Sequence, residues 1–414
     1  MKAGRVRTDA DADPLERGAV VIEAGRVREI VPQSRLPTES DARVIDVGGA
    51  TVLPGFIDAH LHVTTEGAGR LHDEIDTPAH EATAQGERNL ANALSWGVTT
   101  VRDAGSWNDV VLGLRDRSAR RELVAPRVLP CGAPLTTPGG HLYWFGGEAQ
   151  GSDAVRRMVR RQAQLGMTHV KVMATGGWAT KGSDPRIPQF TQEELSAIAD
   201  EARANGIQTM AHIASIEGVR RAVVARIDTL EHCMTQQRDG SWAYPEELLE
   251  QIVRGRFWVD PTPAWHYRTV QSPPPGTSSE RVAELRATRE ARMKLYKRLI
   301  ALGHDRWLTG TDTGGTNPQD YFPLVCEIMV NELGLSPRDV VRAATSDAAR
   351  ALHLDHETGA LRPGLAADLV ATDGDPIEGI LAVWNVRLTV ARGQAVEYAS
   401  GPRMLATSRG GGWE

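Results

Sequence analysis

The segment from Thr51 to Val63, TVLPGFIDAHLHV, decides the fold. Its apolar run Phe56–Leu61 predicts a buried strand that ends in two histidines separated by one residue. Because successive side chains of a strand point to opposite faces, His60 and His62 should lie on the same face. Two imidazoles at the end of one strand can bind a single metal ion, although such a pair is weak evidence when it stands alone.

Seven further apolar runs follow, separated by helical patterns such as Thr191–Ala204, where Thr191 and Glu194 form a capping-box signature. Eight strand–helix units between residues 55 and 356 predict an α/β fold, a closed (β/α)8 barrel of the TIM type. In such barrels the chemistry lies at the C-terminal ends of the strands. The eight runs are Phe56–Leu61, Thr99–Arg102, Arg127–Cys131, His169–Met173, Gln208–Ala211, Asp228–Leu230, Phe257–Pro261 and Trp307–Thr311.

Both ends of the chain contain short strand-like runs instead. These runs are Val20–Ile22, Val27–Ile30, Arg43–Val47, Asp368–Thr372 and residues 386–393, VRLTVARG. The first two flank Ala24 and Gly25, which predicts a hairpin. Neither end can bury an apolar face alone. We therefore expect residues 1–54 and 357–414 to form one small, β-sandwich-like domain beside the barrel.

The composition is ordinary for a globular protein, with 41% hydrophobic and 24% charged residues and a formal net charge of −6. No basic block stands out, so we expect no nucleic-acid partner. The sequence contains no run of 18 apolar residues, so we expect no membrane span. Three cysteines cannot form a disulfide framework and no apolar signal region is visible, so we expect a cytoplasmic protein. The expected partners are a small-molecule substrate and further copies of the chain in a homo-oligomer.

Several other predicted strands also end in polar side chains. Lys171 lies within an apolar run, where an unpaired amine is costly. His212, His232 and Asp312 end the fifth, sixth and eighth runs. Each alone could be an ordinary core or capping residue. Six such positions at the same end of a barrel are a poor match to chance, and they indicate a shared site: His60, His62, Lys171, His212, His232 and Asp312.

Motifs along nearly the whole chain resemble those of the amidohydrolase superfamily. Besides TVLPGFIDAHLHV they are GVTTVRDAG (97–105), HVKVMATGG (169–177), AH (211–212), DTLEH (228–232), LTGTDTGG (308–315) and GALRPGLAADLVATDGDP (359–376). The ATGG segment, followed by DPRIPQFTQEEL (184–195), is most similar to one branch. That branch holds prolidase-like dipeptidases, ochratoxin-type amidases and imidazolonepropionase-related proteins.

The resemblance implies that the six side chains hold two divalent metal ions, for which Zn2+ is the expected choice with mixed N and O ligands. Lys171 would be carboxylated by CO2, and its carbamate would bridge the ions. Asp312 would bind the more buried ion and take a proton from the bridging water. The histidines would divide as His60 with His62 at the more buried ion and His212 with His232 at the other.

The implied reaction is hydrolysis of an amide-type C–N bond by a metal-bridging hydroxide, in a dipeptide, an N-acyl amino acid or a related small amide. The alternative is a deaminase or a cyclic amide or amidine hydrolase of the same superfamily. Those enzymes usually use one ion, lack the strand-four lysine and often have glutamate three residues after the strand-five histidine. Ser215 occupies that position here. A non-catalytic scaffold is a remote alternative, because all six ligand types are retained.

Loop residues are candidates for substrate binding. His141 lies in GGHLYW (139–144), where the resembled branch often has a GGHG-like segment. The resemblance implies that His141 assists catalysis by binding the substrate carbonyl, although Leu142 departs from the pattern. Tyr267 and Arg268, after the seventh strand, could hold a carboxylate. Trp178, after the fourth strand, is a further pocket candidate.

Overall fold

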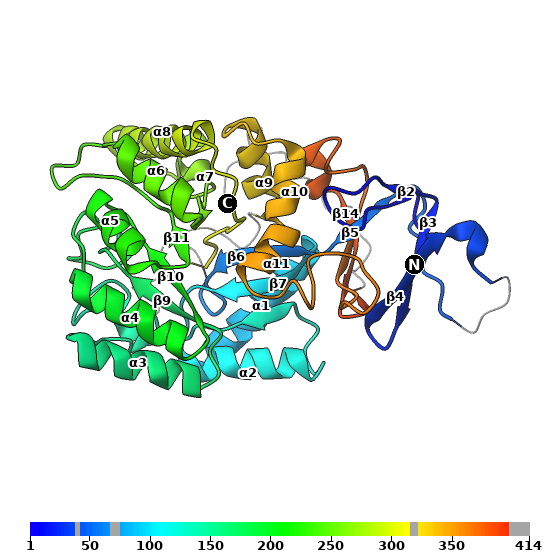
Figure 1. Ribbon diagram of the computed structural model, residues 1–414, viewed down its shortest axis with the longest axis horizontal. Helices are drawn as coiled ribbons and strands as arrows, with labels where there is room; N and C mark the ends of the chain where they lie inside the picture. The colour runs from blue at the N-terminus through cyan, green and yellow to red at the C-terminus, as the bar shows by residue number, and fades with distance from the viewer. Residues whose placement is uncertain (38–41, 67–74, 315–321, 397–414) are drawn as a thin grey trace.

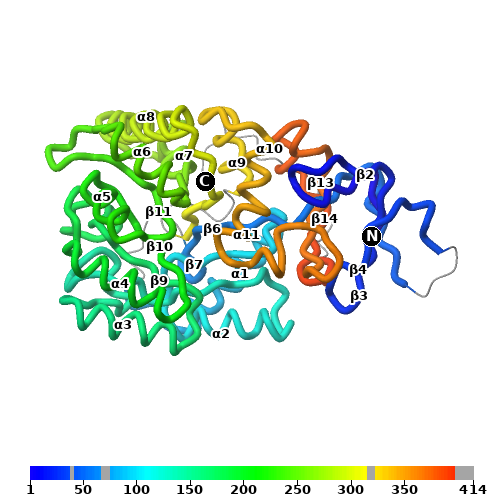
Figure 2. The backbone as a smooth tube through the Cα atoms, viewed as in Figure 1, coloured from blue at the N-terminus to red at the C-terminus, as the bar shows by residue number. Residues whose placement is uncertain are grey.

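The computed structural model describes residues 1–37, 42–66, 75–314 and 322–396. It has two parts, a barrel surrounded by helices and a β-rich region beside it (Figures 1 and 2). The β-rich region combines the blue N-terminal strands with the orange strands near the other end of the chain.

The barrel is a ring of parallel strands in two sheets, β6-β7-β8 and β9-β10-β11-β12. A bridge between Leu135 and Val172 joins the sheets, and residues 307–313 close the ring by bridges to Val259 and Leu61. This arrangement confirms the predicted TIM-type barrel. The strands are β6 (Phe56–Leu61), β7 (Val98–Asp103), β8 (Arg127–Leu129), β9 (His169–Met173), β10 (Gln208–His212), β11 (Thr229–Glu231) and β12 (Trp258–Asp260).

The eighth predicted run, Trp307–Thr311, closes the barrel without forming a regular strand. The N–H groups of Gly310 and Thr311 donate to the side chains of Asp260 and Asp58, at 3.2 Å each, rather than to a neighbouring backbone. The backbone then turns at Asp312, where φ is 56°. Two buried carboxylates therefore replace ladder acceptors where the site begins.

Helices cover the outside of the barrel (Figure 1). The capping box predicted for α4 is confirmed, since Thr191 and Glu194 each accept a backbone N–H from the other. In the described part of the chain, no helix is long and apolar enough to cross a membrane. The helices are α1 (Ala79–Ser95), α2 (Asn108–Ala119), α3 (Ser152–Gln164), α4 (Gln192–Ala204), α5 (Ile216–Ala225), α6 (Glu246–Gly255), α7 (Tyr267–Gln271), α8 (Ser279–Ala301), α9 (Phe322–Asn331), α10 (Pro337–Ala343) and α11 (Ser346–Ala351), with 3-10 turns η1 (Gln33–Arg35), η3 (Tyr143–Phe145) and η4 (Ile380–Trp384).

Strands from both ends of the chain share one six-stranded sheet, ordered β15-β14-β13-β5-β1-β2, beside the hairpin β3-β4. Its bounds are β1 (Arg5–Val6), β2 (Leu15–Glu16), β5 (Thr51–Pro54), β13 (Leu369–Thr372), β14 (Val386–Ala391) and β15 (Gln394–Val396), and the hairpin is β3 (Gly18–Glu23) and β4 (Arg26–Pro32). Val6, Val52 and Leu369 belong to one buried cluster. Both ends therefore contribute to one core.

Two details of this region bear on the predictions. The hairpin turns at Ala24 and Gly25, whose φ values of 51° and 81° suit a two-residue hairpin turn. The strand predicted over Arg43–Val47 is wrong, because only Asp46 forms a bridge, to Lys2, before its side chain accepts the Gly48 N–H and starts a turn. The domain boundaries at 54 and 357 stay a prediction, and residues 397–414 lie outside the described part.

Candidate active site

A pocket of about 500 Å3, including its mouth, lies where the barrel strands end. The substrate candidates His141 and Trp178 line it, but Tyr267 and Arg268 are not part of its lining. The lining also contains all six side chains that the sequence pointed to: His60, His62, Lys171, His212, His232 and Asp312. These side chains thus come from the ends of four β-strands and from the segment 307–313 that closes the barrel, and all of them line one pocket.

Three ligand atoms converge on the β6 side of the pocket. The Nε2 atoms of His60 and His62 lie 3.4 and 3.5 Å from Oδ1 of Asp312. The other ring nitrogens have partners, since His60 Nδ1 is 2.6 Å from Glu231 Oε2 and His62 Nδ1 is 3.2 Å from the Gly105 carbonyl oxygen. With the protons on Nδ1, both Nε2 lone pairs face Asp312. This donor set fits a divalent ion.

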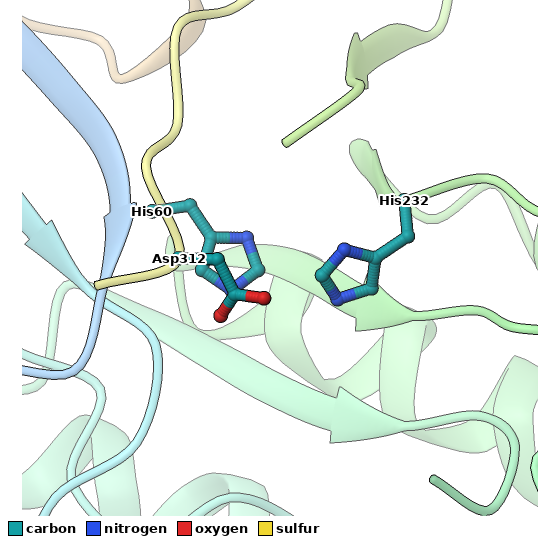
Figure 3. A group of neighbouring side chains, drawn as sticks. All are labelled: His60, His232 and Asp312. Atoms are coloured by element: carbon teal, nitrogen blue, oxygen red, sulfur yellow. The ribbon is translucent and has the colours of Figure 1, made fainter. Parts of the chain in front are cut away.

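A second pair of histidines completes the opposite side of the pocket. His212 Nε2 lies 3.1 Å from the Gly176 carbonyl oxygen, which leaves Nδ1 as its ligand atom. His232 Nδ1 lies 2.7 Å from Thr262 Oγ1, which leaves Nε2. The two ring centres are 4.8 Å apart. Figure 3 shows His232 directed toward His60 and Asp312, and one ligand atom from each of these three lies within 4.8 Å of the others.

Lys171 lies between the two groups of ligands. Its side chain is buried, with 2% of the residue exposed, and Nζ is 3.4 Å from His60 Nε2. Burial lowers the pKa of the Lys171 amine more than the nearby carboxylates of Glu231 and Asp312 raise it. The amine is therefore shifted toward its neutral, nucleophilic form, the form that can attack the carbon of CO2 and lose a proton to make a carbamate.

Burial also sets the charge of the other ligands. It lowers the pKa of His60, His212 and His232, and nearby positive charges, Lys171 among them, lower it further. Neutral imidazoles keep the lone pair that an ion needs. Burial raises the pKa of Asp312, but the combined effect of His60, His62 and Lys171 lowers it by more. The net shift is downward, so Asp312 stays a carboxylate.

A buried charged network lies behind His60, and the sequence analysis did not include it. Arg102 Nη2 donates to Glu231 Oε1 at 2.9 Å, and Arg102 Nε donates to the Ala59 carbonyl oxygen at 2.7 Å. The other Glu231 oxygen contacts His60. A signal was available, because Arg102 ends one predicted barrel run and Glu231 directly follows another, and a buried charge is rarely left unpaired.

His141 is held by the loop after β9. The Leu142 N–H donates to Thr180 Oγ1 at 3.0 Å, and that hydroxyl lies 2.9 Å from His141 Nδ1. The hydroxyl hydrogen is therefore free to bond Nδ1, which leaves the ring proton on Nε2. Burial lowers the pKa of His141 to about 3. A Cβ on Gly177 would lie 2.3 Å from His141 Nε2. The absence of a side chain at this motif glycine therefore leaves room for the neutral His141 ring.

The remaining wall of the pocket is apolar. Trp178 and Trp265 contact each other, with ring centres 5.0 Å apart. Leu142, Met173 and Met234, which sequence reasoning did not identify, also line the pocket. Tyr267 instead lies beneath the Arg289 guanidinium, whose carbon is 4.7 Å from the ring centre. The substrate-binding roles of Tyr267 and Arg268 stay predictions.

Comparisons with known proteins bear on the family and the fold of the chain. The sequence profile of the amidohydrolase family matches residues 51–396. Ochratoxinase from Aspergillus niger is 28% identical over 405 residues, which cover 89% of this chain and 80% of that protein. Imidazolonepropionase from Paracoccus denitrificans is 25% identical over 411 residues, covering 90% and 89%. A solved prolidase in complex with n-methylphosphonate-l-proline is 28% identical with a TM-score of 0.82, and the match covers 96% of this chain and all, 100%, of the other.

Proposed function

The chain belongs to the amidohydrolase family, and from that premise we propose a metal-dependent hydrolase that cleaves an amide-type C–N bond in a small molecule. The observation that carries the proposal is the pocket lined by five buried histidines, Lys171 and Asp312. The names of the similar proteins support the same bond type, since they include an ochratoxinase and a prolidase.

We further propose that the pocket holds two ions, with Zn2+ as the expected metal. The ligands would be His60, His62 and Asp312 for one ion, His212 and His232 for the other, and a carboxylated Lys171 for both. When bound, two divalent ions polarise a substrate carbonyl and make a water molecule more acidic. The ring nitrogens that face the pocket and the lowered pKa of Lys171 support this assignment.

The protein's own groups would orient the substrate and move the proton. Asp312 is a carboxylate within reach of both β6 histidines, so it would accept the proton of the attacking water and pass it to the leaving nitrogen. His141, with its proton on Nε2, would donate a hydrogen bond to the carbonyl oxygen. The wall formed by Trp178 and Trp265 would exclude water and bind an apolar or aromatic group beside the scissile bond.

Metal analysis followed by a substrate screen tests this function. The purified protein should contain about two divalent ions per chain, and it should hydrolyse some members of a set of N-acyl amino acids, Xaa-Pro dipeptides and lactams. Removing the ions should abolish hydrolysis, and restoring Zn2+ should recover it. Full activity without metal would refute the proposal. One ion per chain, with ammonia released from an aminated ring, would favour the deaminase reading.

Location and assembly complete the proposal. We propose a cytoplasmic homo-oligomer. All three cysteines, Cys131, Cys233 and Cys326, are free and buried, which supports a reducing compartment. Sedimentation of the purified protein would test the assembly.

A further inference from the structure

Arg292, in the middle of α8, is fully buried at 0% exposure. Its hydrogen bonds within the described residues go to uncharged oxygens. Nη2 donates to the carbonyl oxygens of Pro261 and Thr262 at 2.6 and 3.0 Å and to Thr262 Oγ1 at 3.1 Å. Nη1 is buried without a hydrogen-bond partner in that part of the chain. Burying a guanidinium without a charged partner costs desolvation free energy, so we expect Arg292 to have a role that offsets this cost.

The backbone is strained at the segment that Arg292 contacts and at the strand end beside it. Thr262 has a φ of 37°, and His232, on the neighbouring strand end, has a φ of 59°. Left-handed backbone is uncommon for non-glycine residues and is an outlier for a β-branched one. Such conformations persist only where the surroundings enforce them. Three hydrogen bonds from one guanidinium nitrogen to residues 261 and 262 supply that enforcement.

Tyr296 acts on the same strand ends from one turn further along α8. Its hydroxyl donates to the His232 carbonyl oxygen at 2.6 Å and accepts from Arg292 Nε at 3.3 Å. Thr262 Oγ1, held by Arg292, lies 2.7 Å from His232 Nδ1. His232 is thus fixed twice, at its backbone by Tyr296 and at its ring by Thr262.

Arg292 also supports the apolar wall. Its guanidinium carbon lies 5.1 Å from the centre of the Trp265 ring, within the range of a cation–π contact. Trp265 lines the pocket, whereas Arg292 is not part of the lining. The arginine therefore contacts the wall residue Trp265 directly and reaches His232 through Thr262, without lining the pocket itself.

We propose that Arg292 and Tyr296 form a clamp that positions His232 for the second metal ion and Trp265 for the pocket wall. The inference rests on the proposed function, since it needs His232 to bind an ion. Both members are positioning residues, because they act on the site through Thr262, His232 and Trp265. The clamp is one way in which a helix outside the barrel holds two neighbouring strand ends in register.

Ion binding by Arg292→Met tests the clamp. Zn2+ affinity is measured by competition with a chromophoric chelator, and ion content by elemental analysis. The site that contains His232 should bind Zn2+ about 10- to 100-fold less tightly, which is the range for loss of a group that orients a metal ligand. The ion content should fall from two ions per chain toward one. The matched control is Arg289→Met. Arg289 is buried on the same helix and donates to the Pro263 carbonyl oxygen at 2.7 Å and to Glu332, but it forms no hydrogen bond with Thr262 or His232.

A second pair of variants keeps the test sharp if Arg292→Met does not fold. Thr262→Ser keeps the hydroxyl that faces His232 and should keep affinity, while Thr262→Val should lose it to a similar extent as Arg292→Met. Unchanged affinity for two ions in both Arg292→Met and Thr262→Val overturns the clamp alone. An equal loss in Arg289→Met also overturns it, by indicating a general packing effect. An unmutated protein that binds no ion overturns the proposed function and the clamp together.

Discussion

The pocket has two faces that are built in different ways. The ligand face is formed by His60, His62, His212, His232, Lys171 and Asp312, and each of its histidines has a hydrogen-bond partner behind it. The apolar face, formed by Leu142, Met173, Trp178, Trp265 and Met234, comes mostly from the loops after the strands. Rigid strands suit atoms whose spacing must match an ion, and loops suit a surface that only has to fit a substrate.

Under the proposed function, bond cleavage depends on the ligand face and substrate choice depends on the apolar face. Changes on the ligand face should alter ion content and kcat. Changes on the apolar face should alter KM while ion content stays constant. The predictions below test that division, beginning with the change that should matter most.

Lys171→Ala should cause the largest loss. It removes the group proposed to bridge both ions, so kcat/KM should fall by about 10^3-fold or more, within or beyond the range of a lost acid–base group. At least one ion should be missing by elemental analysis. A short carboxylic acid in the buffer should restore part of both, because a free carboxylate can occupy the bridge. Two bound ions and near-normal turnover in Lys171→Ala would contradict the carbamate bridge.

Glu231→Gln should have the next largest effect. Glutamine can still accept the hydrogen bond from His60 Nδ1, but it lacks the negative charge that also pairs with Arg102. We expect affinity for the ion at His60 to fall about 10- to 100-fold. Zn2+ competition titrations would measure this. Glu201→Gln, on α4, is a control that removes a carboxylate at the outer surface of the barrel, paired with Arg156. An equal loss in the control would contradict a specific role for Glu231.

The convergence of the six polar side chains could be predicted because parallel barrel strands end on one face, so motifs far apart in sequence reach one space. The hydrogen-bond partners behind these side chains could be predicted only in part. Arg102 ends one predicted run and Glu231 directly follows another, but their pairing depends on strands β7 and β11 facing across the barrel. The eighth strand was predicted as regular, since nothing local shows that Asp58 and Asp260 accept its N–H groups.

The apolar face could not be predicted in the same way. Trp178 and Trp265 lie 87 positions apart, and their contact depends on the paths of two loops. Tyr267, whose substrate-binding role stays a prediction, lies on the short helix α7 against Arg289 of α8, and no local pattern indicates that contact. Loop conformation follows from distant packing rather than from a local periodicity.

Acid stability should report the neutral state of His141, which lines the pocket together with the ligand face. The pKa of His141 falls from 6.5 to about 3 on folding, chiefly through burial. Below pH 6.5 the unfolded chain therefore binds a proton that the folded chain refuses, and stability is lost as the pH falls toward 3. In metal-free protein this histidine should contribute about 1.4 kcal/mol per pH unit to the slope of the unfolding free energy. His141→Gln should reduce the slope between pH 6 and 5 by about that amount in urea titrations, and an unchanged slope would count against the buried neutral state.

Trp178→Ala should have the smallest effect and a different signature. Its indole contacts Trp265 on the apolar face and is only partly buried, so its removal should leave the fold and the ligands intact. An aromatic contact is worth about 0.5–1.5 kcal/mol, which predicts a KM increase of about 2- to 10-fold for a substrate with an aromatic group. The KM increase should be smaller for a substrate that carries a methyl group in place of the aromatic group, because a methyl group makes less contact with the apolar face. Ion content and kcat should remain within about twofold of the unmutated protein, as expected when binding is lost equally from ground and transition states. A fall in ion content would mean that the two faces are mechanically coupled, and the division between them would have to be given up.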